Sequence, residues 1–265
     1  MEDVQNRPDF REFPIDKVGV CDLRYPVVVL DRTREKQTTT ATLSMSVDLP
    51  QEFKGTHMSR FLEVLSRHQD EMSVQTVPSL LKQLRERLHA ASAHLEVAFP
   101  YFVHKTAPVS GASSLMDVQC QFIGEQSEDN EDFVMVVEVP VTSLCPCSKE
   151  ISDYGAHNQR GYVTMEVRTI SDNNAEQPVF WIEELVEIAE ESASAPLYPL
   201  LKRSDERHVT MQAYDNPVFV EDLVRNVAVR LRDDERVAWF RVRTVNHESI
   251  HNHNAFAQIE WTRPS

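Results

Sequence analysis

Two cysteines and a histidine lie close together in the segment SLCPCSKEISDYGAHNQRG, residues 143–161. Cys145 and Cys147 flank a proline, and His157 follows the second thiol by ten residues. Free cysteines most often pack as small hydrophobic residues, but the polar, turn-forming surroundings disfavour burial here. A thiol, an imidazole and a carboxylate suit zinc, iron or manganese. Because the sequence has no second Cys pair to close a structural zinc site, the pattern favours an open site with three protein ligands and a water molecule.

Two further segments concentrate polar side chains. LLKRSDERHVT (200–210) gathers charged residues directly after an apolar run, and taken alone it predicts a solvated charged loop. NHESIHNHNAF (246–256) carries Glu248 and three histidines, more than a turn requires. Alternation would place His251 and His253 on one face, which indicates proton transfer, phosphate contact or metal ligation.

The length, charge and hydrophobic content of the chain exclude some classes of protein. At 265 residues and 41% hydrophobic content, the chain can bury the core of one large domain or two smaller ones. The net charge of −15 disfavours a broad nucleic-acid surface, although a local pocket could still hold a small anion. No apolar run approaches the length of a membrane span or signal peptide. We therefore expect a cytoplasmic protein with neither a nucleic-acid nor a membrane partner.

The hydrophobic pattern divides the chain into two similar series of elements. In the first half we expect strands at 25–30 and 38–48, helices at 58–69 and 76–91, and strands at 94–104 and 114–124. After an acidic link at 124–133 we expect strands at 133–145 and 161–170, helices at 181–192 and 216–232, and strands at 237–246 and 254–261. The order ββααββ thus occurs twice, which predicts an α+β fold with antiparallel sheets and helix pairs on one sheet face. The corresponding units are 1–128 and 129–265, with one continuous α+β domain as the alternative.

Several separated motifs resemble those of the type IB GTP cyclohydrolases, metal-dependent enzymes that open folate synthesis. In chain order they are DVQN (3–6), GTHMSRFLE (55–63), SLCPCSKEIS, GAHNQR, LLKRSDE, AYDNPVFVEDLVR and ESIHNHNAFA. The resemblance implies the tunnelling fold, with two ββααββ units per subunit and a homotetrameric assembly. It also implies hydrolysis of GTP to 7,8-dihydroneopterin triphosphate and formate. The implied cofactor is one divalent metal per subunit, zinc, manganese or iron, without an organic cofactor.

The resemblance also implies roles for individual residues. The implied metal ligands are Cys145, His157 and Glu206. Glu221 resembles the carboxylate that binds the guanine edge, and the remaining active-site groups are Cys147, Glu248 and His251. The triphosphate is expected against some of Lys149, Arg160, Lys202, Arg203 and His253, with Arg60 from a neighbouring subunit as a further candidate.

One segment departs from the expected family pattern, and two other functions stay open. Where we expect many relatives to have Ser-Cys-Glu before Leu-Tyr, this chain has Ser194, Ala195 and Pro196. A reductase of the same fold, which attacks a deazaguanine nitrile with a cysteine and uses NADPH, needs one activated thiolate and no metal. The two thiols together with a histidine and a glutamate favour the cyclohydrolase. A non-enzymatic binding module, whose metal only holds the Cys-Pro-Cys turn, would instead have a closed four-ligand site.

Overall fold

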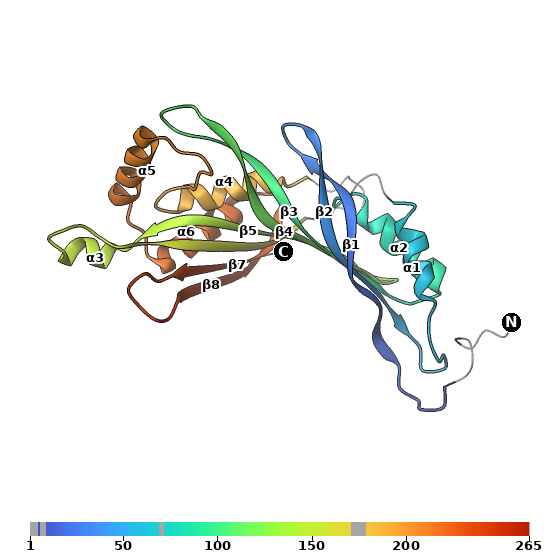
Figure 1. Ribbon diagram of the computed structural model, residues 1–265. Helices are drawn as coiled ribbons and strands as arrows, with labels where there is room; N and C mark the ends of the chain where they lie inside the picture. The colour runs from blue at the N-terminus through green and yellow to red at the C-terminus, as the bar shows by residue number, and fades with distance from the viewer. Residues whose placement is uncertain (1–4, 6–8, 69–71, 171–178, 265) are drawn as a thin grey trace. The chain divides into compact units, whose positions relative to one another are not determined.

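The computed structural model describes residues 5, 9–68, 72–170 and 179–264. In this part of the chain, eight strands form one antiparallel sheet whose spatial order follows the sequence from β1 to β8, and six helices accompany it (Figure 1). The contacts divide into two compact units. The first contains the described residues of Met1–Pro100, Gln121–Met135 and Asp172–Val179, and the second those of Tyr101–Cys120, Val136–Ser171 and Phe180–Ser265.

The first unit is built on a long β-hairpin. Strands β1 (Ile15–Asp31) and β2 (Glu35–Leu49) pair antiparallel along nearly their whole length, and β2 pairs with the first part of β3 (Ala93–Thr106). Helices α1 (Met58–Leu65) and α2 (Val77–Leu88) pack on each other and on these strands. The core consists of alternate strand residues and the apolar helix faces, for example Leu43, Leu95 and Leu84, all fully buried.

The second unit carries most of the predicted functional residues. Its strands are parts of β3, β4 (Ser113–Gln126) and β5 (Glu131–Leu144), with β6 (Asn158–Thr169), β7 (Val237–His247) and β8 (Ala255–Thr262). Its helices are α3 (Pro146–Ile151), α4 (Ile182–Ser192), α5 (Arg203–Asp215) and α6 (Val220–Asp233). Helix α6 packs on β7 and β8, with α4 beside it.

Alternation along the strands of the second unit separates its two sheet faces. The register partners Val163 and Thr244 are both fully buried, as are Met165 and Val242. The residues that alternate with this buried series are polar or charged, for example the next register pair, Glu166 and Arg241. Since α6 packs on β7 and β8, the buried series defines the helix-covered face, and the charged series defines the open face.

The predicted α+β fold with antiparallel strands and tandem helices is confirmed, but the second half has more helices than expected. A short helix, α3, lies within the Cys-Pro-Cys segment, and α5 covers 203–215, where the charged cluster alone predicted a loop. That loop prediction was wrong because the buried carboxylate of Asp205 anchors the helix start, as described below. The repeat boundaries 1–128 and 129–265 rest on element order and stay a prediction. Within the described residues, no helix has the length and apolar character needed to cross a membrane.

Candidate metal and substrate site

Cys145 lies at the junction between β5 and α3. Its backbone is still extended, and it is the N-cap of α3, where its Sγ accepts a hydrogen bond from the Ser148 amide at 3.4 Å. Pro146 is the first residue of the helix, a position at which the missing N–H costs nothing. Cys147 therefore lies in the first helical turn and is exposed, whereas Cys145 is half-buried. The two thiols thus belong to different elements rather than to one face of a strand.

The end of β5 is fixed by the segment that departs from the expected family pattern. Ser194 and Ala195 are both fully buried. The Ser194 hydroxyl accepts a hydrogen bond from the Leu144 amide at 3.0 Å, and Ala195 forms a backbone bridge with Thr142. Ser194 and Ala195 therefore hold the backbone immediately before Cys145.

Asn246 of β7 ties the same end of β5 to β7 across β6. Its Nδ2 donates to the Ser143 hydroxyl at 3.1 Å, although 103 residues separate the two in sequence. Gly161, the register partner of Asn246, makes room for this contact. A Cβ on Gly161 would lie 3.0 Å from Asn246 Oδ1 and 3.1 Å from a Val141 methyl group, tighter than most real contacts. The glycine therefore lets a buried polar side chain join three strands.

The residues that follow on this helix-covered face belong to the predicted site. Cys145 lies two residues beyond Ser143, just after the end of β5, and Glu248 lies two residues beyond Asn246, just after the end of β7. His157 joins them from the start of β6, where its carbonyl accepts a hydrogen bond from the Cys145 amide at 3.2 Å. The structure thus brings Cys145, His157 and Glu248 together at one end of three neighbouring strands.

Glu221 lies close to the same end of β7. It is in the first turn of α6, as the sequence predicted, and its side chain is exposed. The hydroxyl of Thr244, two residues before Asn246 on β7, donates to the carbonyl of Val220 at 3.2 Å. This bond places the start of α6, and with it Glu221, over the last residues of β7.

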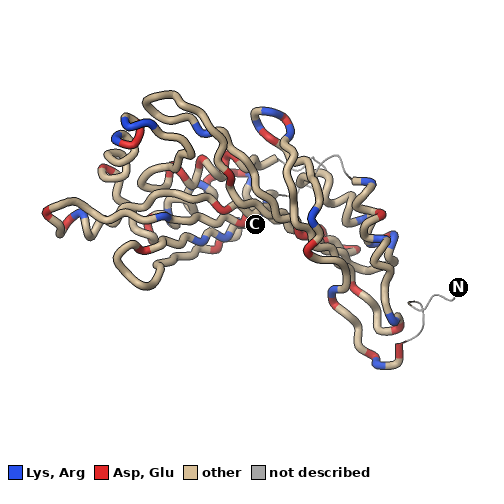
Figure 2. The backbone as a smooth tube through the Cα atoms, in the orientation of Figure 1, with Lys and Arg blue, Asp and Glu red and all other residues tan. Residues whose placement is uncertain are grey.

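Helix α5 carries the predicted ligand Glu206, with the predicted phosphate contacts Lys202 and Arg203 at its start. All three side chains are exposed, and Figure 2 shows both signs of charge at this end of the helix. At the other end, Lys149 Nζ donates to the carbonyl of Tyr214 at 2.5 Å and lies over its ring. Tyr214 is eight residues beyond Glu206, about 12 Å along a helix axis. The contact between α3 and α5 therefore lies at the end of α5 remote from Glu206.

Asp205, the neighbour of Glu206, is fully buried and anchors α5 to the β3–β4 turn. Its carboxylate accepts hydrogen bonds from the amides of Val109, Ser110 and Lys202, each at 2.8 Å, and from the Ser110 hydroxyl at 2.6 Å. Burial alone would raise the pKa of Asp205, but these hydrogen bonds outweigh it and hold the pKa well below its usual range. The charged cluster thus contains one structural acid among exposed residues.

The donor pair Cys145 and His157 suits zinc or a similar divalent ion in chemical type. Among the residues that the structure describes, no group of three or more His, Cys, Asp or Glu side chains within the chain is arranged to hold a metal. All three ligands, Cys145, His157 and Glu206, thus stay predictions.

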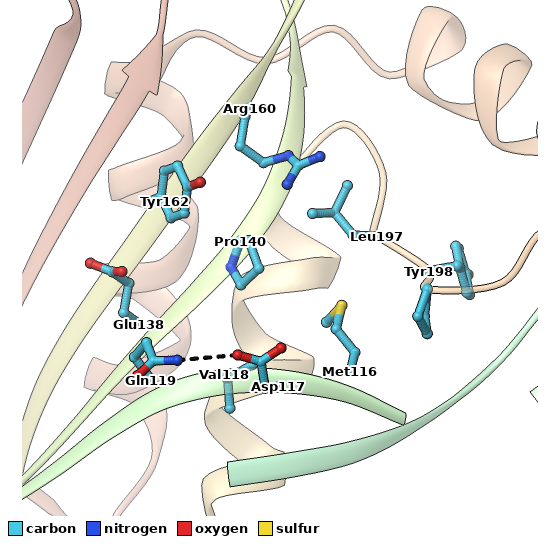
Figure 3. Close-up of a pocket in the computed structure, with 11 residues that line it drawn as sticks. Met116, Asp117, Val118, Gln119, Glu138, Pro140, Arg160, Tyr162, Leu197 and Tyr198 are labelled. Atoms are coloured by element: carbon cyan, nitrogen blue, oxygen red, sulfur yellow. Dashed lines mark hydrogen bonds between the residues drawn. The ribbon is translucent and has the colours of Figure 1, made fainter. Parts of the chain in front are cut away.

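The remaining predicted contacts lie elsewhere in the second unit. His251 and His253 stack on each other in the exposed β7–β8 connection, with ring centroids 5.1 Å apart. Arg160 belongs to the open face of β6, so alternation separates its side chain from the face of Gly161. Figure 3 shows Arg160 at a cavity of about 390 Å³. The cavity is lined by Met116, Asp117, Val118, Gln119, Glu138, Pro140, Arg160, Tyr162, Leu197, Tyr198 and Pro199.

Two of the motif segments lie side by side in the first unit. Of DVQN, only Gln5 is among the described residues; the other three lie outside them. The Gln5 side chain donates to the carbonyl of Thr56 at 2.9 Å, and the backbone carbonyl of Gln5 accepts from the Gly55 amide at 3.2 Å. Arg60 is half-buried on α1 and donates to the carbonyl of Arg87 at 3.3 Å.

The sequence reasoning missed the residues that position this site. Gln159, Asn246 and Ser249 all lie inside or beside quoted motifs but were not singled out. The signal for Gln159 and Asn246 was their place two residues from the candidate site residues His157 and Glu248, which becomes informative once strand boundaries are known.

The fold defines the class of protein first: this is a tunnelling-fold protein. The crystal structure of uricase from Arthrobacter globiformis superimposes with a TM-score of 0.54, covering 94% of this chain and 93% of that chain at 9% identity. A urate oxidase from Bacillus sp. TB-90 gives a TM-score of 0.55, covering 94% of this chain and all of its own, also at 9% identity. At such low identity the likeness shows the fold alone.

Sequence comparison then gives the family. The profile of the type I GTP cyclohydrolase FolE2 family matches residues 1–257. The GTP cyclohydrolase FolE2 of Pelobacter propionicus is 52% identical over 263 residues, 99% of each chain. That of Nitrosococcus oceani is 53% identical over 260 residues, covering 98% of this chain and 95% of the relative. The chain therefore belongs to the type I GTP cyclohydrolase FolE2 family, as the motifs indicated, and the matches do not favour the nitrile reductase or the binding module.

Proposed function

We propose that the protein is a GTP cyclohydrolase that converts GTP to 7,8-dihydroneopterin triphosphate and formate, the first step of tetrahydrofolate synthesis. The observation that carries this proposal is the identity of about half of all residues, along nearly the full chain, with proteins named GTP cyclohydrolase FolE2. The geometry is compatible with it, because the backbones of Cys145 and His157 are hydrogen-bonded and Gln159, two residues beyond His157, binds the Glu248 carboxylate.

The reaction makes two chemical demands at C8 of the purine. Water attacks this carbon only when it is made nucleophilic and when the adjacent ring nitrogens receive protons. A divalent metal bound by Cys145, His157 and Glu206 would supply Lewis acidity and a more acidic water. Glu248 and His251 would move protons during ring opening, loss of formate and the later sugar rearrangement. Cys147, exposed beside Cys145, would contact the reacting part of the substrate.

Guanine recognition requires an acceptor for two adjacent donors. The N1–H and 2-amino groups of guanine can both donate to one carboxylate. Glu221 offers such a carboxylate at the start of α6, close to the end of β7, and its exposed side chain is open to a ligand. Phosphate contacts would come from some of Lys149, Arg160, Lys202, Arg203 and His253.

Assembly and location belong to the same proposal. We infer a homotetramer in the cytoplasm, the arrangement expected for a biosynthetic enzyme of this family. The sheet ends in two edge strands, β1 and β8, and an edge strand presents unpaired N–H and C=O groups that another copy can pair. Within a tetramer, predicted contacts that one chain leaves apart could be completed by a second copy.

The test begins with chelated, purified protein. After addition of GTP and one divalent metal at a time, formate and the oxidised, fluorescent pterin should appear in equal amounts. Cys145→Ala and His157→Ala should lose bound metal and at least about 100-fold in turnover. Cys21→Ala, which removes another exposed thiol in the first unit, should keep both.

Two outcomes would reject the proposal. If GTP stayed intact with every metal tested, the proposed activity would be rejected. If Cys145→Ala and His157→Ala both kept full metal content and turnover, the assignment of these residues as ligands would be rejected, while the activity would stand.

A further inference from the structure

Two side-chain hydrogen bonds join β6 to the β7–β8 connection where the backbone ladder stops. The last register pair at this end is Arg160 with His247. Beyond it, Gln159 Nε2 donates to Glu248 Oε1 at 3.0 Å, and His157 Nδ1 lies 3.1 Å from the Ser249 hydroxyl. These two bonds, between 157–159 and 248–249, are called the β6–β7 clamp below.

The clamp determines which nitrogen of His157 can face a ligand. A neutral imidazole has one N–H donor and one lone pair, and a serine hydroxyl can accept from the N–H. In the tautomer in which Nδ1–H donates to Ser249, the lone pair lies on Nε2. The backbone of His157 is fixed as well, because its amide donates to the Ser148 hydroxyl at 3.2 Å and its carbonyl accepts from Cys145. Metal-binding histidines generally have such a partner on the second ring nitrogen, which fixes tautomer and orientation.

The other half of the clamp fixes a carboxylate. Glu248 is half-buried, and Gln159 occupies one of its oxygens. Within the described residues, Gln159 Oε1 is buried without a hydrogen-bond partner. Leaving a buried acceptor unpaired destabilises the fold, so stability alone does not explain an amide here. The amide does hold the Glu248 side chain in one place.

We propose that Ser249 and Gln159 are positioning residues: Ser249 holds His157 so that Nε2 is presented to the metal, and Gln159 holds Glu248 for proton transfer. The inference rests on the proposed function, since it needs a metal at Cys145 and His157. It adds to that function a division of labour, with one residue acting on metal affinity and the other on turnover.

Cobalt binding tests the Ser249 half without any assay of activity. Apoprotein is titrated with Co²⁺, and the thiolate-to-cobalt absorption band reports the metal beside Cys145. Ser249→Ala should weaken Co²⁺ binding by about 10- to 100-fold, the usual effect of losing such a partner. Ser249→Thr, which keeps the hydroxyl, should restore most of the affinity. Ser113→Ala, an exposed serine at the start of β4, is the matched control and should bind as the parent does.

The outcomes separate the clamp from the metal site itself. Parent protein that binds no Co²⁺ overturns both the metal site and the clamp. Parent protein that binds Co²⁺, together with an equally tight Ser249→Ala variant, overturns the clamp alone. Nitrogen-15 NMR of labelled histidines gives a second measurement, because the Nδ1–H tautomer of His157 should dominate in the parent apoprotein and lose that preference in Ser249→Ala.

Kinetics with GTP tests the Gln159 half. Gln159→Ala should bind Co²⁺ as tightly as the parent, keep KM for GTP, and lose about 10-fold or more in kcat, because the proton-transfer group is no longer held. A merely structural role would lower thermal stability without this split between kcat and KM. Unchanged kcat in a folded Gln159→Ala variant would overturn the role of Gln159.

Discussion

An acidic residue at position 221 has both a structural and a functional explanation. Acidic residues are favoured in the first turn of a helix by the positive end of the helix dipole, and Asp222 occupies the same turn of α6. The two differ in their neighbours: Asp222 accepts a hydrogen bond from Arg225 at 3.3 Å, within its own helix. Glu221, the exposed acid of the pair, is the one free to meet a substrate.

Replacing Glu221 by glutamine should impair recognition of the guanine edge. The amide sets an N–H against the substrate's own donors, and hydrogen bonds to charged groups contribute about 1.5–3 kcal/mol. We expect kcat/KM for GTP to fall by about 10- to 100-fold, measured by steady-state pterin formation. For inosine triphosphate, which lacks the 2-amino group, the same substitution should lower kcat/KM by a smaller factor.

Asp222→Asn is the matched control for this substitution, since it changes a neighbouring carboxylate in the same turn. It should keep the parent's preference for GTP. If Glu221→Gln retained the parent's kinetics with both nucleotides, Glu221 would have no part in the pocket.

At the scale of elements, α5 depends on one buried acid. Asp205 satisfies the exposed amide of Lys202 at the helix start and two amides of the β3–β4 turn. Unpaired N–H groups at a helix start destabilise it unless a side chain accepts from them. One carboxylate therefore holds a helix and a hairpin turn that are almost 100 residues apart in sequence.

The lowered pKa of Asp205 predicts a specific loss of stability in acid. A carboxylate whose folded pKa lies below its unfolded value of 3.8 contributes stability that is present above that value and lost as pH falls through the folded pKa. We expect the midpoint of thermal unfolding to fall from about pH 5 downward more steeply in the parent than in Asp205→Asn. At neutral pH the variant should unfold several degrees earlier.

Asp153→Asn, an exposed acid in the connection after α3, serves as the control and should follow the parent curve. Parallel acid curves for the parent and Asp205→Asn would show that the carboxylate does not act through its ionised form.

At the scale of the whole molecule, the free edges of the sheet favour association. Strand β1 has 17 residues, and Phe256 on β8 is 65% exposed. Long edges without covering elements tend to pair with another chain unless they are protected. The net charge of −15 opposes association of identical copies at long range, an effect that salt screens.

We therefore expect a homo-oligomer whose affinity increases with ionic strength. Analytical ultracentrifugation over a range of protein and salt concentrations should show a tetramer that persists on dilution in moderate salt. A protein that sediments as a monomer at every concentration and salt level would contradict the assembly, and with it any site shared between copies.

The sequence by itself predicted the strands, the fold class, the family and four of the six described helices, but not α3 or α5. These depend on local periodicity and on residue types in motifs, both of which are readable along the chain. The charged segment 200–210 was misread because a helix there depends on partners from the β3–β4 turn, which no local pattern contains.

Only the tertiary structure decided which side chains meet. Ser249 reaches His157 across 92 residues, and Asn246 reaches Ser143 across 103, because register and alternation place them at the same end of the successive strands β5, β6 and β7. It also placed Arg160 on the opposite sheet face from Gly161, since neighbours in an extended strand point to opposite sides. Residue types indicate the chemistry, but contacts between strands that are distant in sequence depend on the register of the whole sheet.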